Sequence, residues 1–501
     1  MLRKNLQQIL KNPCQAAGVV PVTDNFLISL RVACQIQAAR YMNIRNFLFC
    51  LLLAAMMQSA ATAQKNGADQ RPNIIFVLTD DHRFDALGAA GNPIIQTPHL
   101  DQLAHRGILF RNAYVTTSIC CVSRASLLTG QYESRHGIND FRTDLSQAAL
   151  ENTYPLLLKK AGYTIGFVGK YGVGHHFPIQ YFDYWSCSEK EQPDYILTDK
   201  AGNTIHNTDS VGHDIRLFLD SFGRKSPFCL SVSFKAPHEL DGNPPTYPVQ
   251  QRFDSLYAHV SIPEPLTADE KYWNSFPDFF RDEQNIARVR WKPLLSTPEK
   301  FQETVKNYYR LISGVDEVVG NMVQQLKELG IDKNTVILFM GDNGFCLGEH
   351  GLEGKWYGYE ESIRVPMILY DPRLPGKVNG TPSQLMVLNI DIAPTILSLA
   401  SVPVPQTMQG ADLESMAKGK IAPRKDFFYE HRFLGSPRLP SEEGVVTGDF
   451  KYMNYYEHGY EELFSIRADP KETTNLAGDK KYAATLDAMR KRCAVLKKQV
   501  Q

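Results

Sequence analysis

The stretch Asn73-Ile-Ile-Phe-Val-Leu-Thr-Asp-Asp-His-Arg83 decides the fold class. Its run from Ile74 to Leu78 is short, apolar and rich in branched side chains, which is typical of a strand buried on both faces. The run ends abruptly in polar residues that begin with Thr79. The stretch therefore predicts a central strand of an α/β sheet with acidic side chains at its carboxyl end.

A second run repeats this design far along the chain. Thr335 to Met340 is again apolar, and Gly341-Asp-Asn-Gly344 follows it. Between the two runs, residues 305–329 carry apolar side chains at helical spacing until Gly330 ends the pattern. Such alternation predicts a large, mostly parallel or mixed sheet covered by helices. Because the carboxyl ends of parallel strands line the ligand crevice, we expect the two acidic ends to meet in space.

Two later regions depart from this rhythm. Residues 239–300 are rich in proline and aromatic residues and indicate a long excursion of the kind that shapes substrate sites. From about residue 421 the pattern changes to aromatic strands, at 426–429 and 452–456, and a closing helix at 481–498. We therefore expect a catalytic domain at 72–420 and a smaller C-terminal α+β subdomain at 421–501.

The N-terminal region contains a pattern typical of export. Met42 opens a basic segment, an apolar run and the small-residue site Ala61-Thr-Ala63, so residues 42–63 are interpreted as a signal peptide. Residues 1–41 are interpreted as a start-site artefact, and 64–71 as a linker. An uncleaved anchor is the alternative. We expect a periplasmic or secreted protein without stable membrane insertion after cleavage.

The composition excludes some partners. The 501 residues include 54 Lys+Arg and 54 Asp+Glu, so no global basic field favours nucleic acid. The nine cysteines are scattered and form no disulfide framework. In an oxidising compartment, one or two bridges are an open alternative among Cys187, Cys229, Cys346 and Cys493.

The two acidic strand ends have the composition of a metal site. Asp80, Asp81, Asp342 and Asn343 offer oxygen ligands only, which suits Ca²⁺, or less well Mg²⁺, rather than Zn²⁺. The alternative is that each acidic pair caps a following helix.

The segment Cys120-Cys-Val-Ser-Arg-Ala-Ser-Leu-Leu-Thr-Gly130 is the main candidate for chemistry. Its pattern predicts a helix from about Ser123 to Gly130, which would place Cys120 just before the helix amides, in an anion-binding position. A cysteine pair here could equally be a packing element or a bridge. The whole segment, however, resembles the modification signature of the type I sulfatases, C-x-P-S-R-x-x-x-L-T-G. It departs from the usual signature at Val122.

This resemblance implies an alkaline phosphatase-like fold and a site that depends on formylglycine and calcium. Cys120 would be oxidised to formylglycine by the formylglycine-generating enzyme and would become the nucleophile that removes sulfate from a carbohydrate. The calcium ligands would be the four oxygen donors above together with the modified Cys120. Arg124 would hold and polarise the hydrated aldehyde.

Three further segments extend the resemblance. Gly169-Lys-Tyr171 is similar to the family's G-K-W-H-x-G element and supplies Lys170, as in glucosamine-6-sulfatase-like members. Gly172 stands where many members have a catalytic histidine, and whether His175 or His176 takes that place is left open. Ala236-Pro-His238 implies that His238 is the general acid, and Gly348-Glu-His-Gly-Leu-Glu-Gly-Lys355 supplies the second sulfate-binding lysine, Lys355.

The function that we expect is hydrolysis of a sulfated glycan or polysaccharide. His431 and Arg432, near the start of the small subdomain, are candidate glycan contacts, with surface residues at a strand end as the alternative. Two rival functions stay open. One is a phosphatase or phosphodiesterase of the alkaline phosphatase superfamily, and the other is a glycan-binding protein without catalysis.

Overall fold

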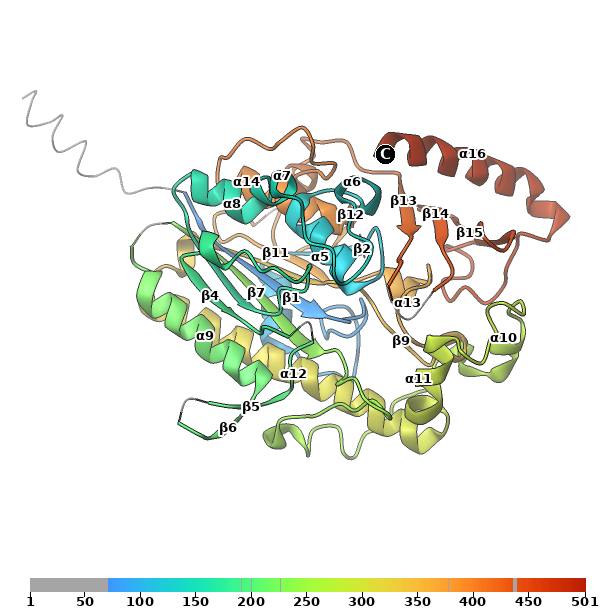
Figure 1. Ribbon diagram of the computed structural model, residues 1–501, viewed down its shortest axis with the longest axis horizontal. Helices are drawn as coiled ribbons and strands as arrows, with labels where there is room; N and C mark the ends of the chain where they lie inside the picture. Colours follow the sequence, from blue (N-terminus) through green and yellow to red (C-terminus); the bar gives the residue numbers. More distant parts are fainter. Residues whose placement is uncertain (1–70, 191, 200, 226, 377, 436–438) are drawn as a thin grey trace, which may run out of the picture. The chain divides into compact units, whose positions relative to one another are not determined.

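Eight strands form the central sheet of the protein, in the order β12-β2-β11-β8-β1-β7-β3-β4 (Figure 1). The computed structural model describes residues 71–190, 192–199, 201–225, 227–376, 378–435 and 439–501. The predicted signal peptide and the segment before it lie outside the described residues. The strands are β12 Ser383–Leu388, β2 Ile108–Tyr114, β11 Met367–Tyr370, β8 Thr335–Gly341, β1 Asn73–Asp80, β7 Phe228–Pro237, β3 Thr164–Gly169 and β4 Tyr184–Cys187.

The sheet is mostly parallel, as predicted. Every neighbouring pair is parallel except the two that involve β11, which runs antiparallel to both β8 and β2. The long parallel connections pass through helices, and the sheet and helix layers match the expected α/β class. Within the described residues, no helix combines the length and the apolar character needed to cross a membrane.

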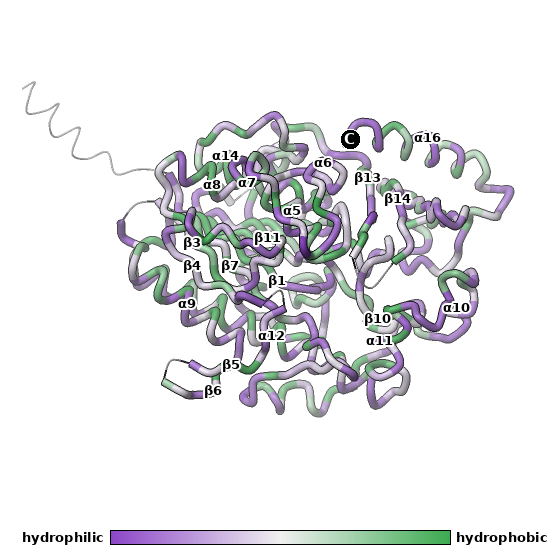
Figure 2. Tube along the Cα trace, viewed as in Figure 1, coloured by the Kyte–Doolittle hydropathy of each residue, from purple (hydrophilic) through white to green (hydrophobic). Residues whose placement is uncertain are grey.

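Helices cover both faces of the sheet because the strand side chains are apolar on both sides (Figure 2). On β1, Ile74, Phe76 and Leu78 pack on one face, and Ile75 and Val77 pack on the other. The first face is covered by α5 Cys120–Thr129, α8 Tyr154–Lys160 and α14 Ile392–Leu399, and the second by α4 Pro98–Arg106, α9 Asn207–Phe222 and α12 Pro298–Leu329.

The register of β1 on β8 brings the two acidic strand ends together. The strands pair in parallel from Asn73 opposite Thr335 to Thr79 opposite Gly341. The residues that follow Thr79 and Gly341 therefore emerge side by side at the same edge of the sheet. The predicted meeting of these ends is confirmed.

The C-terminal region forms an antiparallel sheet with one long helix. Its strands are β13 Asp426–His431, β14 Glu442–Thr447, β15 Lys451–Tyr455 and β16 Tyr460–Phe464, and α16 Ala483–Val500 closes the chain. In the excursion at 239–300, the described residues contain short helices and no named strand, with α10 at Glu270–Asn274 and α11 at Ile286–Leu295. Figure 1 shows α10 and α11 on the same side of the molecule as the C-terminal sheet.

The structure decides one open alternative and corrects one expectation. Cys187, Cys229, Cys346 and Cys493 are all thiols, so the possible bridges among them do not form. Helix α5 begins at Cys120, three residues before the expected start. Its N-cap, Ile119, is extended and makes no side-chain cap, so no polar residue marks the true start in the sequence.

Candidate active site

The candidate active site lies at the carboxyl ends of the central strands, opposite the N-terminus of α5. Asp80 ends β1, and Asp342 and Asn343 follow β8. The other candidates come from the same edge: Asp81 after β1, Lys170 after β3, His238 after β7, Cys120 and Arg124 on α5, and Lys355 after β10 Glu353–Gly354. The structure thus brings together all nine residues to which a catalytic or metal-binding role was assigned.

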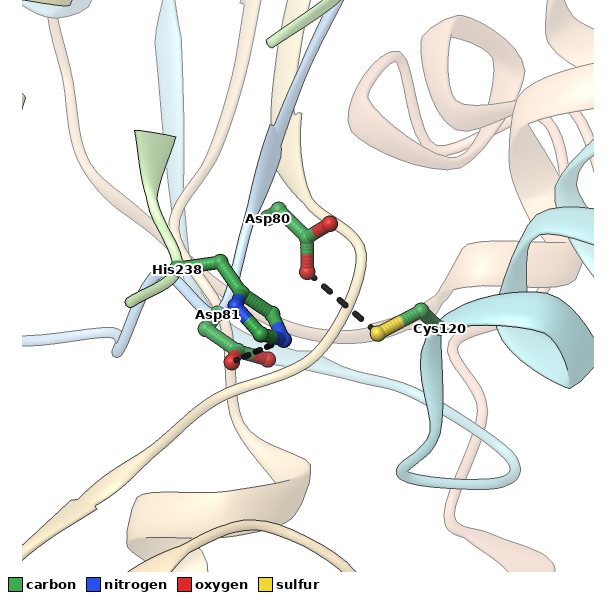
Figure 3. A group of neighbouring side chains, drawn as sticks. All are labelled: Asp80, Asp81, Cys120 and His238. Carbon is green, nitrogen blue, oxygen red and sulfur yellow. Dashed lines mark hydrogen bonds and ion pairs between the residues drawn. The ribbon is translucent and has the colours of Figure 1, made fainter. Parts of the chain in front are cut away.

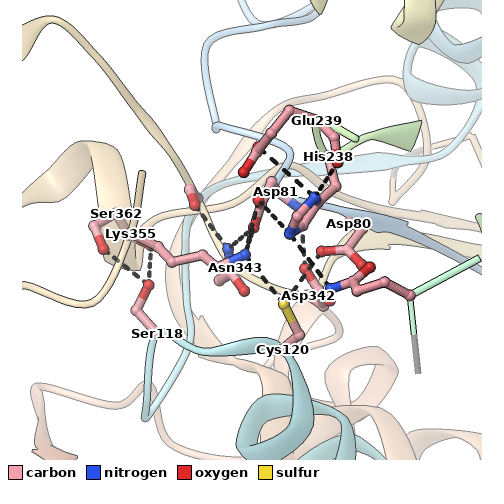
Figure 4. Close-up of polar contacts among 12 residues, drawn as sticks. Asp80, Asp81, Ser118, Cys120, His238, Glu239, Asp342, Asn343, Lys355 and Ser362 are labelled. Atoms are coloured by element: carbon pink, nitrogen blue, oxygen red, sulfur yellow. Dashed lines mark hydrogen bonds and ion pairs between the residues drawn. The ribbon is translucent and has the colours of Figure 1, made fainter. Parts of the chain in front are cut away.

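The acidic set is connected directly across the two strand ends. The backbone N–H of Asp81 donates to Asp342 Oδ1 at 3.1 Å, and Asn343 Nδ2 donates to Asp81 Oδ1 at 2.6 Å (Figure 4). Asp81 has a φ of 60°, in the left-handed region that a non-glycine residue rarely adopts. All four residues, Asp80 included, are completely buried.

The carboxyl groups of the site lie close together, and this proximity affects their pKa values. Burial raises the pKa of Asp81 well above its ordinary value, and the neighbouring Asp80 adds to this against the opposing charge of Lys355. For Asp80, burial also disfavours the charged form, but Lys170, with Arg124 and Lys355, overcomes it and holds the pKa well below its ordinary value. The site therefore needs positive charge to keep all its carboxylates ionised.

Cys120 occupies the centre of this charged group. Its Sγ donates to Asp80 Oδ1 at 3.3 Å and accepts from Lys355 Nζ at 3.2 Å. Figure 3 shows its side chain directed toward Asp80, with Asp81 and His238 beside them. Burial and the Asp80 charge raise the pKa of the Cys120 thiol well above its ordinary value. An unmodified Cys120 would therefore be a protonated thiol and a weak nucleophile.

Three cations bind the carboxylates around Cys120. Arg124 Nε donates to Asp342 Oδ2 at 2.9 Å, and Lys170 Nζ donates to Asp80 Oδ2 at 2.5 Å. Lys355 Nζ contacts both oxygens of Asp81, at 2.6 and 2.8 Å. These buried cations are placed where they can neutralise an anion that enters the site.

His238 presents one defined nitrogen to the site. Its Nδ1 lies 2.6 Å from the carbonyl oxygen of Glu239, and since a carbonyl only accepts, Nδ1 carries the proton. Nε2 then faces Asp81 Oδ2 at 3.5 Å and the amide of Gln192 at 3.5 Å. Burial and Lys355 lower the pKa of His238 well below its ordinary value.

The site opens into a cavity of about 230 Å³. Cys120, His238 and Lys355 line it. Its remaining lining residues, all of which sequence reasoning missed, are Ile119, Phe141, Gln192, Asp241, Ile286, Arg290 and Trp356. An aromatic ring beside a carboxylate and a guanidinium is a surface suited to a sugar.

Most of these missed residues had no local signal. Arg290 lies in the excursion, where it pairs with both Glu239 and Asp241. Gln192 belongs to an irregular segment before β5 Ile196–Thr198. Trp356 follows Lys355 directly, so adjacency to a predicted site residue was the one usable signal.

The structure explains the glycine at position 172. Gly172 has a φ of +70°, and a Cβ built there would lie 2.7 Å from Arg124 Cδ. A histidine at this position would collide with the arginine. His175 and His176 lie beyond it, where their backbone amides donate to Asp144, and the side chain of His176 is 90% exposed. Neither histidine lines the cavity.

The two candidates from the small subdomain also lie away from the cavity lining. His431, at the end of β13, is 1% exposed, and Arg432 pairs with Glu430 at 3.1 Å. The ring of His431 contacts Phe433, whose ring packs on the cavity residue Phe141 at 5.1 Å. The subdomain therefore supports one wall of the cavity from behind.

The oxygen donors of the site fit a hard cation. Asn343 Oδ1 is buried and has no hydrogen-bond partner within the described structure, so it is an acceptor without a donor. Asp80, Asp81, Cys120 and His238 can each offer a ligand atom within 4.8 Å of the others. A cation among the carboxylates would satisfy Asn343 and relieve their mutual repulsion.

Two family models match the chain. The model described as Sulfatase matches residues 72–402, and that described as N-sulphoglucosamine sulphohydrolase, C-terminal, matches residues 348–499. Together these matches span the central sheet and the C-terminal sheet.

Curated relatives and solved structures agree with these matches. N-acetylglucosamine-6-O-sulfatase of Bacteroides thetaiotaomicron is 29% identical, over 86% of this chain and 87% of the relative. N-acetylglucosamine-6-sulfatase of Homo sapiens is 29% identical, over 81% of each chain. A solved structure of a protein in complex with its substrate D-glucosamine-2-N,6-O-disulfate is 28% identical with a TM-score of 0.73, over 86% of this chain and 98% of that chain.

A phosphonate monoester hydrolase shares the fold. Phosphonate monoester hydrolase from Silicibacter pomeroyi has a TM-score of 0.74 at 21% identity, over 86% of this chain and 96% of that chain. This likeness establishes the architecture alone.

Proposed function

Because the chain belongs to the sulfatase family, we propose that it hydrolyses sulfate esters of a carbohydrate, using a formylglycine formed from Cys120 and a bound calcium ion. Its class, a sulfuric ester hydrolase, follows from family membership. One observation carries the mechanism: Cys120 lies 3.3 Å from Asp80 and 3.2 Å from Lys355 at the floor of the cavity. A nucleophile generated there would meet an incoming sulfate beside its neutralising groups.

The calcium ion would be held by Asp80, Asp81, Asp342 and Asn343. Oxygen donors of this kind suit Ca²⁺. The buried Asn343 Oδ1 has no hydrogen-bond donor within the described residues, which supports a cation beside it. Calcium supplies positive charge that stabilises the anionic sulfate group and the nucleophile beside it. The hydrated aldehyde of a formylglycine supplies an attacking hydroxyl and then a second hydroxyl whose ionisation releases sulfate.

The chain's own residues would position and neutralise the reactants. Lys170 and Lys355 would exchange part of their contact with the carboxylates for the sulfate oxygens. Arg124 is fixed by Asp342 and by Ser233 Oγ, which accepts at 2.6 Å. Its Nη2 donates to Asp80, the carboxylate that Cys120 contacts, so its charge lies beside position 120. His238 lines the cavity, and its Nε2 would first take up a proton from solvent when the anionic sulfate group binds beside it. It would then transfer this proton to the sugar oxygen as the ester bond breaks.

Mass analysis of one tryptic peptide tests the modification. Cleavage after Arg111 and Arg124 yields Asn112–Arg124, which contains Cys120. Protein made in a host with the formylglycine-generating enzyme should give this peptide with one oxygen in place of sulfur and two hydrogens. The peptide also contains Cys121, so a sample that releases sulfate while both thiols of the peptide remain would contradict the proposal. The Val122 departure makes this step the most informative one.

The substrate class that we propose is a sulfated amino sugar or a glycan that contains it. Two relatives are named for N-acetylglucosamine 6-sulfate chemistry, and a structural neighbour holds a disulfated glucosamine. Release of free sulfate from a panel of defined mono- and oligosaccharides should show preference for a 6-sulfated glucosamine. Phosphomonoesters and phosphodiesters belong in the same panel, since faster turnover of either would favour the rival phosphoesterase function.

Export completes the proposal. The pattern at 42–63 would direct the protein to the periplasm or the medium, where glycan substrates are met. N-terminal sequencing of secreted protein should begin at Gln64. A mature chain that retains Met42 and stays membrane-bound would contradict it.

A further inference from the structure

Lys235 is a buried lysine beside the proposed site to which no role has yet been given. It lies on β7 within the otherwise uncharged run Phe228–Phe234 and Ala236–Pro237, and its exposed fraction is 0%. Its Nζ donates to Gln192 Oε1 at 3.4 Å and lies 5.4 Å from the centre of the Tyr195 ring. Within the described residues, no carboxylate reaches ion-pair distance of this ammonium group. A charge buried in this way is costly unless something else compensates it.

Gln192 connects Lys235 with the sulfate-binding machinery. Its Oε1 also accepts from Lys170 Nζ at 3.1 Å, so one amide oxygen lies between two ammonium groups. Its Nε2 lies 3.5 Å from Nε2 of His238. The carboxamide therefore contacts two residues that the proposed reaction uses, together with Lys235.

The same carboxamide separates the lysines from the cavity. Gln192 lines the cavity, whereas Lys170 and Lys235 do not. A neutral amide oxygen compensates two ammonium groups only weakly, because it carries no net charge. Burial, followed by the charge of Lys170, lowers the pKa of Lys235. Lys170 already pairs with Asp80, so Lys235 is the cation that this arrangement leaves without an opposite charge. An anionic oxygen at the position of Gln192 Oε1 would supply that charge.

We infer that Lys235 is a third lysine that contacts the sulfate group of the substrate, and that Gln192 Oε1 marks the position of one sulfate oxygen. This inference rests on the proposed sulfatase function and deepens it by assigning a further substrate-binding residue. When the sulfate group enters, the Gln192 side chain turns aside and its oxygen is replaced by an anionic one. Lys170 and Lys235 then share the sulfate oxygen.

A buried lysine elsewhere in the protein shows how a purely structural lysine is compensated. Lys451 is also 0% exposed, but its Nζ forms ion pairs with Glu472 at 2.6 Å and Glu360 at 3.1 Å. Lys235 has an amide and an aromatic ring where Lys451 has two carboxylates. The difference indicates that Lys235 is built to receive an anion from outside.

Calorimetric titration of inorganic sulfate into the matured, calcium-loaded full chain tests the inference. K235M should bind sulfate at least about tenfold more weakly, since one charge-assisted hydrogen bond is lost. K235R should recover most of the affinity. Q192A should bind sulfate a few-fold more tightly, because the competing amide oxygen is gone. K225M, at an exposed lysine before the same strand, is the matched control and should bind as the wild type does.

Thermal unfolding without ligand separates a binding role from a structural one. K235M should be at least as stable as the wild type, because a buried cation is replaced by an apolar side chain of similar length. Wild-type sulfate affinity in K235M overturns the inference, with or without a loss of stability. Should K235M fail to fold, unchanged or weaker sulfate binding by Q192A overturns it.

The kinetic arm distinguishes this inference from the proposed function. On a sulfated glucosamine, K235M should raise KM by about tenfold or more and recover in K235R. Absence of sulfate release by the matured wild type would refute the proposed function, whereas the calorimetric comparison would still report on Lys235. An active wild type with an unaltered K235M would refute the assignment of Lys235 alone.

Discussion

Two buried charge clusters in this protein differ in what surrounds them. The cavity cluster lies under the cavity around Cys120 and consists of Asp80, Asp81, Arg124, Lys170, Asp342 and Lys355. The seam cluster lies where the central domain meets the C-terminal sheet and consists of Glu349, Glu360, Glu361, Lys451 and Glu472. Both unite segments that are far apart in sequence, and all their members are nearly or completely buried. No member of the seam cluster lines the cavity.

The comparison shows that buried charge alone does not identify a functional site. In the cavity cluster three cations face three carboxylates, and an unpartnered oxygen of Asn343 indicates room for one more cation. In the seam cluster Lys451 faces Glu360 and Glu472, and burial raises the pKa of Glu472 to about 8. One cluster is arranged to receive ions, and the other balances itself with a proton.

Removal of the nucleophile should give the largest effect. C120A should lower kcat for sulfate release by about 10⁴-fold or more, because no other residue supplies the attacking oxygen. Its melting temperature should stay close to that of the wild type, since a small buried thiol is lost. C493A, at a buried thiol of α16, is the matched control and should keep full activity. Substantial turnover by C120A would show that the chemistry does not pass through this residue.

Removal of calcium should give the next largest effect on activity. After chelation and dialysis, turnover should fall by roughly a thousandfold, because the metal's share of charge stabilisation amounts to several kcal/mol. Stability should fall as well, since a ligand of the folded state is withdrawn. Added Ca²⁺ should restore both, and metal analysis should find calcium bound to the wild type but not to D342A. Full activity in a sample free of metal would contradict the assignment.

Short sequence patterns predicted the individual strands and helices, because these depend on the spacing of apolar residues within one segment. The apolar runs at β1 and β8 and the helical spacing of α12 were all found, and the two acidic ends met because their strands are parallel neighbours. The start of α5 was misplaced because Ser123 looks like a cap, whereas the true N-cap is Ile119. Which loop residues complete a site depends on tertiary packing that no local pattern records.

Gln192 and Arg290 illustrate this limit. Gln192 comes from an irregular segment, and Arg290 comes from the excursion, which was expected to shape the site without any residue being named. Lys235 did carry a signal, because a lysine inside a strand that is buried along its whole length has to be compensated. The meeting of the acidic ends was thus predictable from the strand order, whereas the placement of the excursion residues around them was not.

Disruption of the seam cluster should lower the stability of the protein and leave its catalytic activity unchanged. K451M removes the cation from Glu360 and Glu472 and should lower the free energy of unfolding by about 3–5 kcal/mol. Because these residues lie away from the cavity lining, kcat/KM of the folded fraction should change by less than about threefold. Chemical denaturation and steady-state assays check the two statements. K491M breaks an exposed pair with Asp487 and should change neither. A large loss of activity in folded K451M would erase the distinction between the clusters.

The smallest expected effect is a pH dependence of stability that the seam cluster introduces. The pKa of Glu472 is about 8 in the folded protein, above its ordinary value of 4.5, because burial outweighs the attraction of Lys451. At pH below 4.5 both the folded and unfolded states hold the proton, and the contribution to stability is complete. As pH rises from 4.5 to about 8, the unfolded state releases the proton first, so stability is progressively lost.

E472Q keeps the shape of the protonated acid at every pH and should remove this dependence. Relative to the wild type, it should gain at most about 1.4 kcal/mol for each pH unit between pH 5 and pH 8 in denaturant unfolding, because the unfolded wild type releases one proton that the folded state keeps. E328Q, at an exposed glutamate of α12, is the matched control. Parallel stability curves for wild type and E472Q would mean that Lys451 keeps Glu472 ionised. In that case the seam cluster, like the cavity cluster, would be balanced by cations, and a proton would no longer distinguish the two.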